Sequence, residues 1–246
     1  MNYQFTTIQD RPELRPQINQ LTEVIWPPFM HQDPIGNKYW PRLFDDFPQC
    51  QIVLLENDDV IGIGNTIPIY WDRPHNELPD TGWDWALETA MTQADQSVKP
   101  NALNGLQIAI AHTHQGKQLS GEFVARFREV AQQQSLKHIL IPVRPTLKHR
   151  YPLTPIEKYI QWKNAEDLPF DPWLRLHIKL GGQIIKACPQ AMNIPGSVDD
   201  WESWTDMKFP ESGQYVIPQA LVPIEMNCEK DIGTYLEPNV WVAHQI

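Results

Sequence analysis

The stretch LQIAIAHTHQGKQLSGEFVARFREVAQQQ, residues 106–134, decides the fold. Its apolar run at 106–111 predicts a buried strand, and the spacing of apolar residues at 121–134 predicts an amphipathic helix. The first turn of a helix leaves amide N–H groups without partners and carries a fractional positive charge. A phosphate satisfies both, so the loop with Gly116 and Lys117 is a candidate anion site. An ordinary surface turn has the same order of elements, and short glycine motifs give many false positives.

Strand and helix patterns alternate around this unit. Strands are predicted at 3–8, 51–56, 60–71, 138–143, 183–192, 214–226 and 233–243, and helices at 12–26, 37–47, 83–95, 172–182 and 198–207. A strand–helix–strand unit with a buried second strand predicts a parallel or mixed sheet with helices on its faces. Gly62 and Gly64 lie inside a predicted hairpin strand without a following helix, so they do not form a dinucleotide fingerprint. We expect one domain over residues 1–246.

The composition argues against several classes of partner. The net charge of −10 argues against nucleic acid, which needs a clustered basic face. No apolar run approaches the ~18 residues of a membrane span, and no signal peptide is expected at the start, so we expect no membrane partner. Three cysteines without a CxxC pair predict neither a zinc site nor a disulfide framework and fit a cytoplasmic protein. His112 and His114 have no carboxylate or cysteine nearby in sequence, so no metal is expected.

Four segments resemble the Gcn5-related N-acetyltransferase (GNAT) superfamily. Residues 51–70 resemble its second and third strands, and LQIAIAHTHQGKQLS at 106–120 resembles its fourth strand and acyl-CoA loop, often written QGKGLG. Residues 121–143 resemble the next helix and strand, and RLHIKLGGQII at 175–185 is similar to the family's RLYEKLGF segment. The resemblance covers about residues 3–194. It implies an α/β fold with a GNAT-like mixed central sheet flanked by helices, an inserted segment after the fifth strand and an extended C-terminal part.

The resemblance also implies a site for acyl-CoA, as a co-substrate. Backbone amides of the loop would bind the CoA pyrophosphate, and the strand end would pair with the pantetheine arm. The implied residues are Ile110, Ala111, His112, Gln115, Gly116, Lys117, Gln118, Leu119 and Ser120. Gln118 stands where the family has glycine, so it is strained if its φ is positive. Ser120 is small and is also a good helix N-cap.

His177 stands where the family's tyrosine commonly protonates the leaving thiolate. An imidazolium can donate that proton, so the resemblance implies that His177 is the catalytic acid. The alternative is a half-buried histidine that packs on the CoA side of its helix. Asp84, Glu88 and His112 are candidates for the general base by position alone.

Two segments exceed the family's minimal plan. The insertion at 144–172 opens with a basic cluster of Arg144, Lys148 and Arg150, which we expect either to bind a CoA phosphate or an acidic substrate group, or to be a solvated loop. Trp71, Trp83 and Trp85 either wall an acyl or acceptor pocket or are core aromatics of an inserted helix.

The resulting expectation is an acyl-CoA-dependent N-acyltransferase, in the first place an acetyltransferase. Its acceptor is an amine of an unidentified small molecule or protein, transfer is direct within a ternary complex, and a homodimer is left open. One alternative is an acyl-CoA-binding GNAT-like protein with decarboxylation or thioester chemistry, or with no catalysis. Another is a non-catalytic interaction module.

Overall fold

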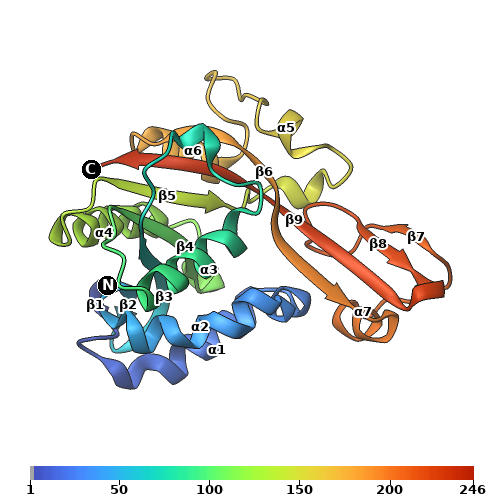
Figure 1. Cartoon of the computed structure of the whole chain (residues 1–246), viewed down its shortest axis with the longest axis horizontal. Coiled ribbons are helices and arrows are strands. Elements are labelled where there is room, and N and C mark those ends of the chain that lie inside the picture. The colour runs from blue at the N-terminus through green and yellow to red at the C-terminus, as the bar shows by residue number, and fades with distance from the viewer. Residues whose placement is uncertain (1–2) are drawn as a thin grey trace.

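The computed structural model describes residues 3–246 (Figure 1). The strands are β1 (Tyr3–Thr7), β2 (Gln51–Glu56), β3 (Asp59–Ile69), β4 (Ala102–Ile110), β5 (His138–Val143), β6 (Gln183–Gly196), β7 (Gly213–Tyr215), β8 (Ile224–Asn227) and β9 (Ile232–Gln245). The helices are α1 (Arg15–Ile25), α2 (Pro34–Asp46), α3 (Gly82–Asp95), α4 (Leu119–Gln133), α5 (Ile156–Tyr159), α6 (Pro172–Lys179) and α7 (Val198–Thr205). Within residues 3–246, no helix is both long and apolar enough to cross a membrane.

The strands form one sheet in the order β1-β2-β3-β4-β5-β9-β8-β7, and β6 pairs with β9 away from this path. Every pairing is antiparallel except that of β4 with β5. The predicted α/β class and the mixed sheet with helices on its faces are therefore confirmed. The single-domain interpretation of residues 1–246 stays a prediction.

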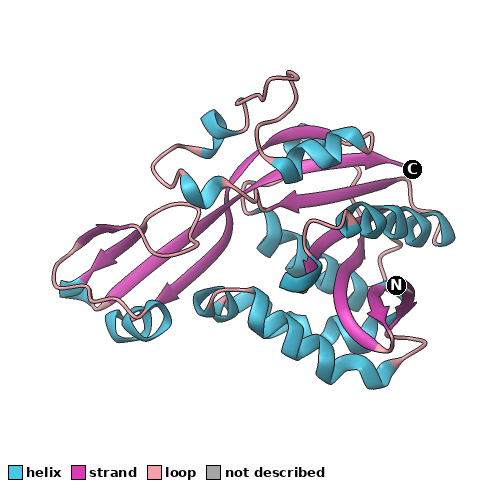
Figure 2. Ribbon diagram, turned by 180° about the vertical axis from the view of Figure 1, so that it is seen from behind, coloured by secondary structure: helices cyan, strands magenta, loops and turns pink. Residues whose placement is uncertain are grey.

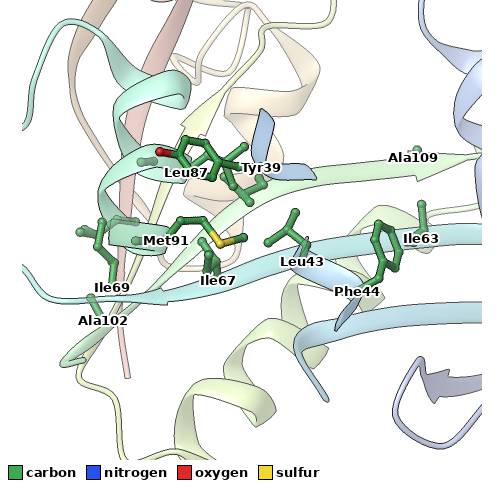
Figure 3. Packing of buried hydrophobic residues seen from close by; sticks show 14 of the residues in the cluster. Tyr39, Leu43, Phe44, Ile63, Ile67, Ile69, Leu87, Met91, Ala102 and Ala109 are labelled. Atoms are coloured by element: carbon green, nitrogen blue, oxygen red, sulfur yellow. The ribbon is translucent and has the colours of Figure 1, made fainter. Parts of the chain in front are cut away.

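Two hydrophobic cores lie on opposite faces of the sheet, as the alternation of side chains along a strand requires. In β2, Val53 and Leu55 belong to the core under α1, α2 and α3, whereas Ile52 and Leu54 belong to the core under α4. Figure 3 shows the first core, in which several buried side chains of α2 and α3 gather over β3. These apolar faces hold the helices against the sheet.

The glycines of β3 make room for α4. A Cβ added at Gly64 would lie 2.7 Å from both Phe123 and Phe127, two fully buried rings of α4. At Gly62 the added atom would lie 3.0 Å from Phe123. These two glycines therefore serve helix–sheet packing, which agrees with rejecting a dinucleotide fingerprint here.

The strands β4 and β5 diverge after a short parallel contact. They pair only where Ala102, Leu103 and Asn104 face residues 138–140, yet β4 continues to Ile110 and β5 to Val143. Along its other edge, β4 pairs with β3, and the register shifts between Gly105 and Gln107. Leu106 is therefore an extra residue of β4 without a partner in β3. Such a bulge bends the strand and increases its twist. The sheet is thus open between the carboxyl halves of β4 and β5.

The C-terminal part forms an arm that extends from the main body (Figures 1 and 2). Its two long strands, β6 and β9, pair with each other, and β7, β8 and α7 pack at the far end. Phe29 of the short 3-10 helix η2 (Pro28–Gln32) enters this arm's core, with ring centroids 5.9 Å from Trp201 and 5.3 Å from Tyr235. The arm therefore fixes η2, which leads directly into α2.

Some element boundaries differ from the sequence prediction. Helix α4 begins at Leu119, so Ser120 lies in its first turn and is not its N-cap. Strand β4 begins at Ala102 and not at residue 106, because Asn104 is buried within the sheet despite its polarity. The strand predicted at 214–226 is broken into β7 and β8, since Pro218 and Pro223 lack the N–H group that a ladder needs.

Candidate active site

The loop between β4 and α4 has a left-handed backbone at two positions. Gly116 has φ +80°, and Gln118 has φ +64° and ψ +11°. A non-glycine residue in this region is strained by roughly 1–2 kcal/mol. The side chain of Gln118 is exposed and makes no capping hydrogen bond at the start of α4. The loop thus keeps a glycine-like backbone shape although glycine is replaced.

The amides of this loop are available to a ligand. Among residues 3–246, none provides an acceptor for the backbone N–H groups of Gly116, Lys117 and Gln118. The Gln115 side chain donates to the Ile110 carbonyl at 3.1 Å and so ties the loop to the last residue of β4. Together with the N-terminus of α4, the arrangement fits an anion such as a pyrophosphate.

A cavity of about 1270 Å³ occupies the opening between β4 and β5. It runs along residues 105–110 of β4 to the loop and first turn of α4, and on its other side it reaches η2 and α2. Of the residues predicted to bind acyl-CoA, those that line the cavity are Ile110, Gln115, Gly116, Gln118, Leu119 and Ser120. Ala111, His112 and Lys117 are not among its lining residues. The volume exceeds the usual ligand pocket of about 300–1000 Å³ and suits two substrates.

The carboxyl groups of the buried Asp33 and the half-buried Asp84 meet beside the end of the cavity formed by α2 and α3. Asp33 lines the cavity as the N-cap of α2, where its Oδ2 accepts the Gly36 N–H at 2.5 Å. Asp84, in the first turn of α3, accepts the Asn193 N–H at 3.0 Å through its Oδ2 and hydrogen-bonds to the Asp33 side chain. Burial raises the pKa of Asp33 to about 6. Burial and then the charge of Asp33 raise the pKa of Asp84 to about 8.

Tryptophans form the wall beside this pair. The rings of Trp40 and Trp83 are stacked with centroids 5.8 Å apart and planes 27° apart, and both residues line the cavity. Trp83 Nε1 donates to the carbonyl of the bulge residue Leu106 at 2.9 Å, which fixes the ring against β4. Trp71 and Trp85 pack edge to face outside the cavity lining. The pocket-wall interpretation therefore fits Trp83, and the core interpretation fits Trp71 and Trp85.

Arg144 also lines the cavity, but an internal carboxylate holds it. Its Nε donates to Glu237 Oε1 at 2.5 Å, and its Nη2 donates to the Gln219 carbonyl at 2.8 Å. Burial lowers the pKa of Arg144, but attraction to Glu237 outweighs it, so the pKa is raised and the guanidinium stays charged. Arg144 therefore compensates the fully buried Glu237.

The basic cluster predicted from the sequence does not form. Lys148 is fully buried, and its Nζ donates to the carbonyls of Tyr151 at 2.9 Å and Leu221 at 2.6 Å. Arg150 is exposed and does not line the cavity. Arg144, Lys148 and Arg150 therefore lie in three different surroundings, Arg150 fits the solvated-loop alternative, and binding of an anion by any of them stays a prediction.

His177 does not reach the cavity. The residue is fully buried in α6, and its Nδ1 lies 2.9 Å from His244 Nε2. Because Arg128 donates to His244 Nδ1 at 2.9 Å, His244 must donate to His177, which leaves the proton of His177 on Nε2. Burial, reinforced by His244, lowers the pKa of His177 to about 3. A neutral, enclosed imidazole is poorly suited to protonate a thiolate in the cavity, so the structure argues against His177 as the catalytic acid.

The three candidates for the general base lie in different places relative to the cavity. Asp84 hydrogen-bonds to the cavity-lining Asp33 but is not itself a lining residue, and Glu88 and His112 are exposed and also lie outside the lining. Sequence reasoning missed Asp33 and Glu237. The Asp-Pro pair at the start of α2 is a helix-start signal that marks Asp33. A glutamate inside the apolar run of β9 marks Glu237, because buried carboxylates need special partners.

Comparison with known proteins places the chain in a family. It is 34% identical over 250 residues to the arginine N-acetyltransferase avaD of Aspergillus versicolor, an alignment that covers 90% of this chain and 86% of that protein. No family model matches the sequence.

Solved structures share the fold. The loading GNATL domain of CurA from Lyngbya majuscula matches with a TM-score of 0.63 at 18% identity and covers 100% of this chain and 98% of that one. The GphF GNAT-like decarboxylase in complex with isobutyryl-CoA matches with a TM-score of 0.61 at 14% identity, over 100% and 99% of the two chains. At these identities the likeness concerns the fold alone. Together with the open sheet, the glycine-like loop and the extended alignment with an N-acetyltransferase, it shows that the chain belongs to the Gcn5-related N-acetyltransferase superfamily, as an acyl-CoA-dependent N-acyltransferase.

Proposed function

We propose that the protein transfers an acetyl group from acetyl-CoA to a nitrogen of arginine or of a small molecule that carries an arginine side chain. The observation that carries this proposal is the cavity, which joins the loop at residues 115–120 to a buried acidic end within one space. Such a cavity accommodates a thioester and an acceptor together, as direct transfer requires. The arginine N-acetyltransferase of Aspergillus versicolor supports the choice of acceptor.

The donor half of the site uses mainly backbone groups. The amides of Gly116, Lys117 and Gln118 and the N-terminus of α4 bind the pyrophosphate. The pantetheine arm lies along the free edge of β4 near Ile110, where divergence from β5 leaves backbone groups without a strand partner. Recognition through backbone explains how Gln118 is accommodated, because its exposed side chain leaves the amide accessible.

The reaction itself is an acyl exchange between sulfur and nitrogen. The acceptor nitrogen attacks the thioester carbonyl, a C–N bond forms, and the C–S bond breaks. The nitrogen loses a proton, and the CoA thiolate leaves and takes one up. The protein orients the two reactants within one cavity, which can supply about 7–11 kcal/mol of the barrier.

The site of action is the cytoplasm in this proposal. All three cysteines are free, and Cys50 and Cys188 are buried, which fits a reducing environment. The acceptor is therefore a metabolite or peptide of that compartment.

The test is a transfer assay with defined products. Thiol release from acetyl-CoA is followed with L-arginine, and mass spectrometry measures acetylarginine. We expect one acetylarginine for each thiol released and little release without arginine. Malonyl-CoA serves as the control for decarboxylation. Thiol release without acetylarginine, or loss of CO₂ from malonyl-CoA in place of transfer, would overturn the proposal.

A further inference from the structure

We propose that Asp33 and Asp84 form the recognition site for the positive charge of the acceptor, with Trp40 and Trp83 as its aromatic wall. This inference rests on the proposed function and adds where, and by which chemistry, the acceptor is held. The ligand class is a planar or compact organic cation, either a guanidinium or an ammonium group.

The first observation concerns the hydrogen bonds of the two oxygens of each carboxyl group. Each uses its Oδ2 for a local backbone N–H group, from Gly36 for Asp33 and from Asn193 for Asp84. Each has an Oδ1 that is buried and accepts no hydrogen bond from an N–H or hydroxyl donor among residues 3–246, apart from the hydrogen bond between the two carboxyl groups themselves. Asp33 is only 2% exposed and lines the cavity, and Asp84 hydrogen-bonds to it from outside the lining, which requires the two carboxyl groups to share a proton. Buried carboxylate oxygens without donors are unfavourable unless a ligand or a shared proton compensates them.

The second observation is that the protein provides no cation here. Within residues 3–246, no lysine, arginine or histidine forms an ion pair with Asp33 or Asp84. The other buried carboxylate of the cavity, Glu237, is compensated by Arg144. Glu88, one turn further along α3, is a negative charge that also acts on Asp84. With one proton shared between them, the pair keeps one negative charge that no cation of the protein neutralises, and a positively charged acceptor can supply that partner.

The third observation is the geometry of the wall. A Cβ placed at Gly36 would lie 3.1 Å from Asp33 Oδ2 and 3.6 Å from Trp83 Cη2, so the carboxylate and the indole ring flank the same space. Trp40 stacks on Trp83 and continues that face. A guanidinium binds carboxylates with paired N–H bonds in its plane and stacks its face on an aromatic ring. The acidic pair and the stacked indoles together supply both contacts.

Two elements far apart in sequence hold this arrangement. Asp33 is fixed by η2, whose Phe29 is anchored in the core of the arm, and Asp84 is fixed by α3 through the backbone of Asn193 in β6. Met192, the neighbour of Asn193, lines the cavity and pairs with Glu237 across β6 and β9. The arm therefore sets the position of the acceptor site relative to β4.

The test measures binding, so it does not depend on which nitrogen is acetylated. L-Arginine, agmatine and citrulline are titrated by calorimetry into the full-length protein saturated with CoA. Citrulline has the shape of arginine but a neutral ureido group in place of the guanidinium. We expect the wild type to bind arginine and agmatine at least 10-fold more tightly than citrulline. Asp33→Asn and Asp84→Asn should each weaken the two cations by about 10- to 100-fold, the range of a hydrogen bond to a charged group, and leave citrulline within about 3-fold.

The matched control removes one acidic charge one turn along the same helix. Glu88 is exposed and lies outside the cavity lining, so Glu88→Gln should change the affinity for arginine by less than about 3-fold. Both Asn variants keep an acceptor oxygen for their backbone N–H partners, and their thermal unfolding is measured to confirm folding. The inference is overturned if citrulline binds as well as arginine, if the Asn variants bind like wild type, or if Glu88→Gln loses as much as they do. Binding of arginine without turnover would reject the proposed function and leave the cation site standing, whereas turnover with cation affinity unchanged in both variants would reject the cation site alone.

Discussion

Replacement of Asp84 by asparagine should change how stability depends on pH. The folded protein holds Asp84 at a pKa of about 8, against 3.8 for an ordinary aspartate, because of burial first and then the charge of Asp33. The folded state therefore binds a proton that the unfolded state releases, so the free energy of unfolding falls as pH rises toward 8. Between pH 6.5 and 8 this loss amounts to about 2 kcal/mol. Asp84→Asn cannot titrate and should not show it.

The assay is scanning calorimetry of wild type and Asp84→Asn between pH 6.5 and 8. The difference in melting temperature, variant minus wild type, should grow by about 4–8 °C across that range for a chain of this size. Burial lowers the pKa values of His177 to about 3 and of His244 to about 4, so these histidines act in the opposite direction near pH 6.5. They are present in both proteins and cancel in the difference. Glu88→Gln serves as the charge control, and parallel curves for wild type and Asp84→Asn would refute the buried acidic pair.

Variants at Gln118, Arg144 and His177 test the rest of the site. Calorimetry should show that Gln118→Gly binds CoA at least as tightly as wild type, because the backbone at this position already has a φ of +64° that glycine adopts readily. Gln118→Val should bind about 10-fold more weakly, because a β-branched residue resists a positive φ. Equal affinities of the two variants would reject the argument that the loop binds CoA through its backbone shape. Arg144→Gln should lower the free energy of unfolding by about 3–5 kcal/mol, because Glu237 is left buried without its ion-pair partner. The double variant that also carries Glu237→Gln should recover most of this loss in thermal unfolding. Absence of recovery would disprove that the two residues stabilise each other. His177→Phe removes the hydrogen bond to His244 and should lower the free energy of unfolding by about 1–3 kcal/mol. Its kcat, corrected for the fraction of folded protein, should stay within a few-fold of wild type. A 100-fold loss of kcat in a folded variant would support His177 as the catalytic acid.

The donor half of the site could be predicted from the sequence because it is local. A strand, a polar loop and a helix follow one another at 106–134, and the hydrophobic period of each element is readable from that stretch alone. The position of Gln118 was marked by the resemblance, and its positive φ agrees with the glycine that the family has there. The boundary errors at β4 and α4 came from Asn104 and Ser120, whose polarity suggested a loop and a cap but which lie within the elements.

The acceptor half could not be predicted because its contacts join distant segments. Asp33 and Asp84 belong to different helices, and nothing in the spacing of either indicates that their carboxylates meet. The burial of Lys148 and His177 could not be predicted from the sequence either, because both have charged or polar neighbours along the chain. Lys148 is enclosed by contacts with the arm, and His177 by its contact with β9. The residues at 144–150 looked like one basic cluster because sequence shows charge but not its internal partners.

This division has a consequence for how specificity is set. The donor loop works through backbone amides, so a side-chain change such as Gln118 is tolerated provided that the backbone keeps its shape. The acceptor site works through the negative charge of the Asp33–Asp84 pair and through the indole wall of Trp40 and Trp83, so one substitution there alters which molecule is bound. The arm supports that second half, because Phe29 of η2 and Asn193 of β6 hold the two carboxylates in place. Changes in the arm core should therefore shift the affinity for the acceptor while the affinity for CoA stays constant.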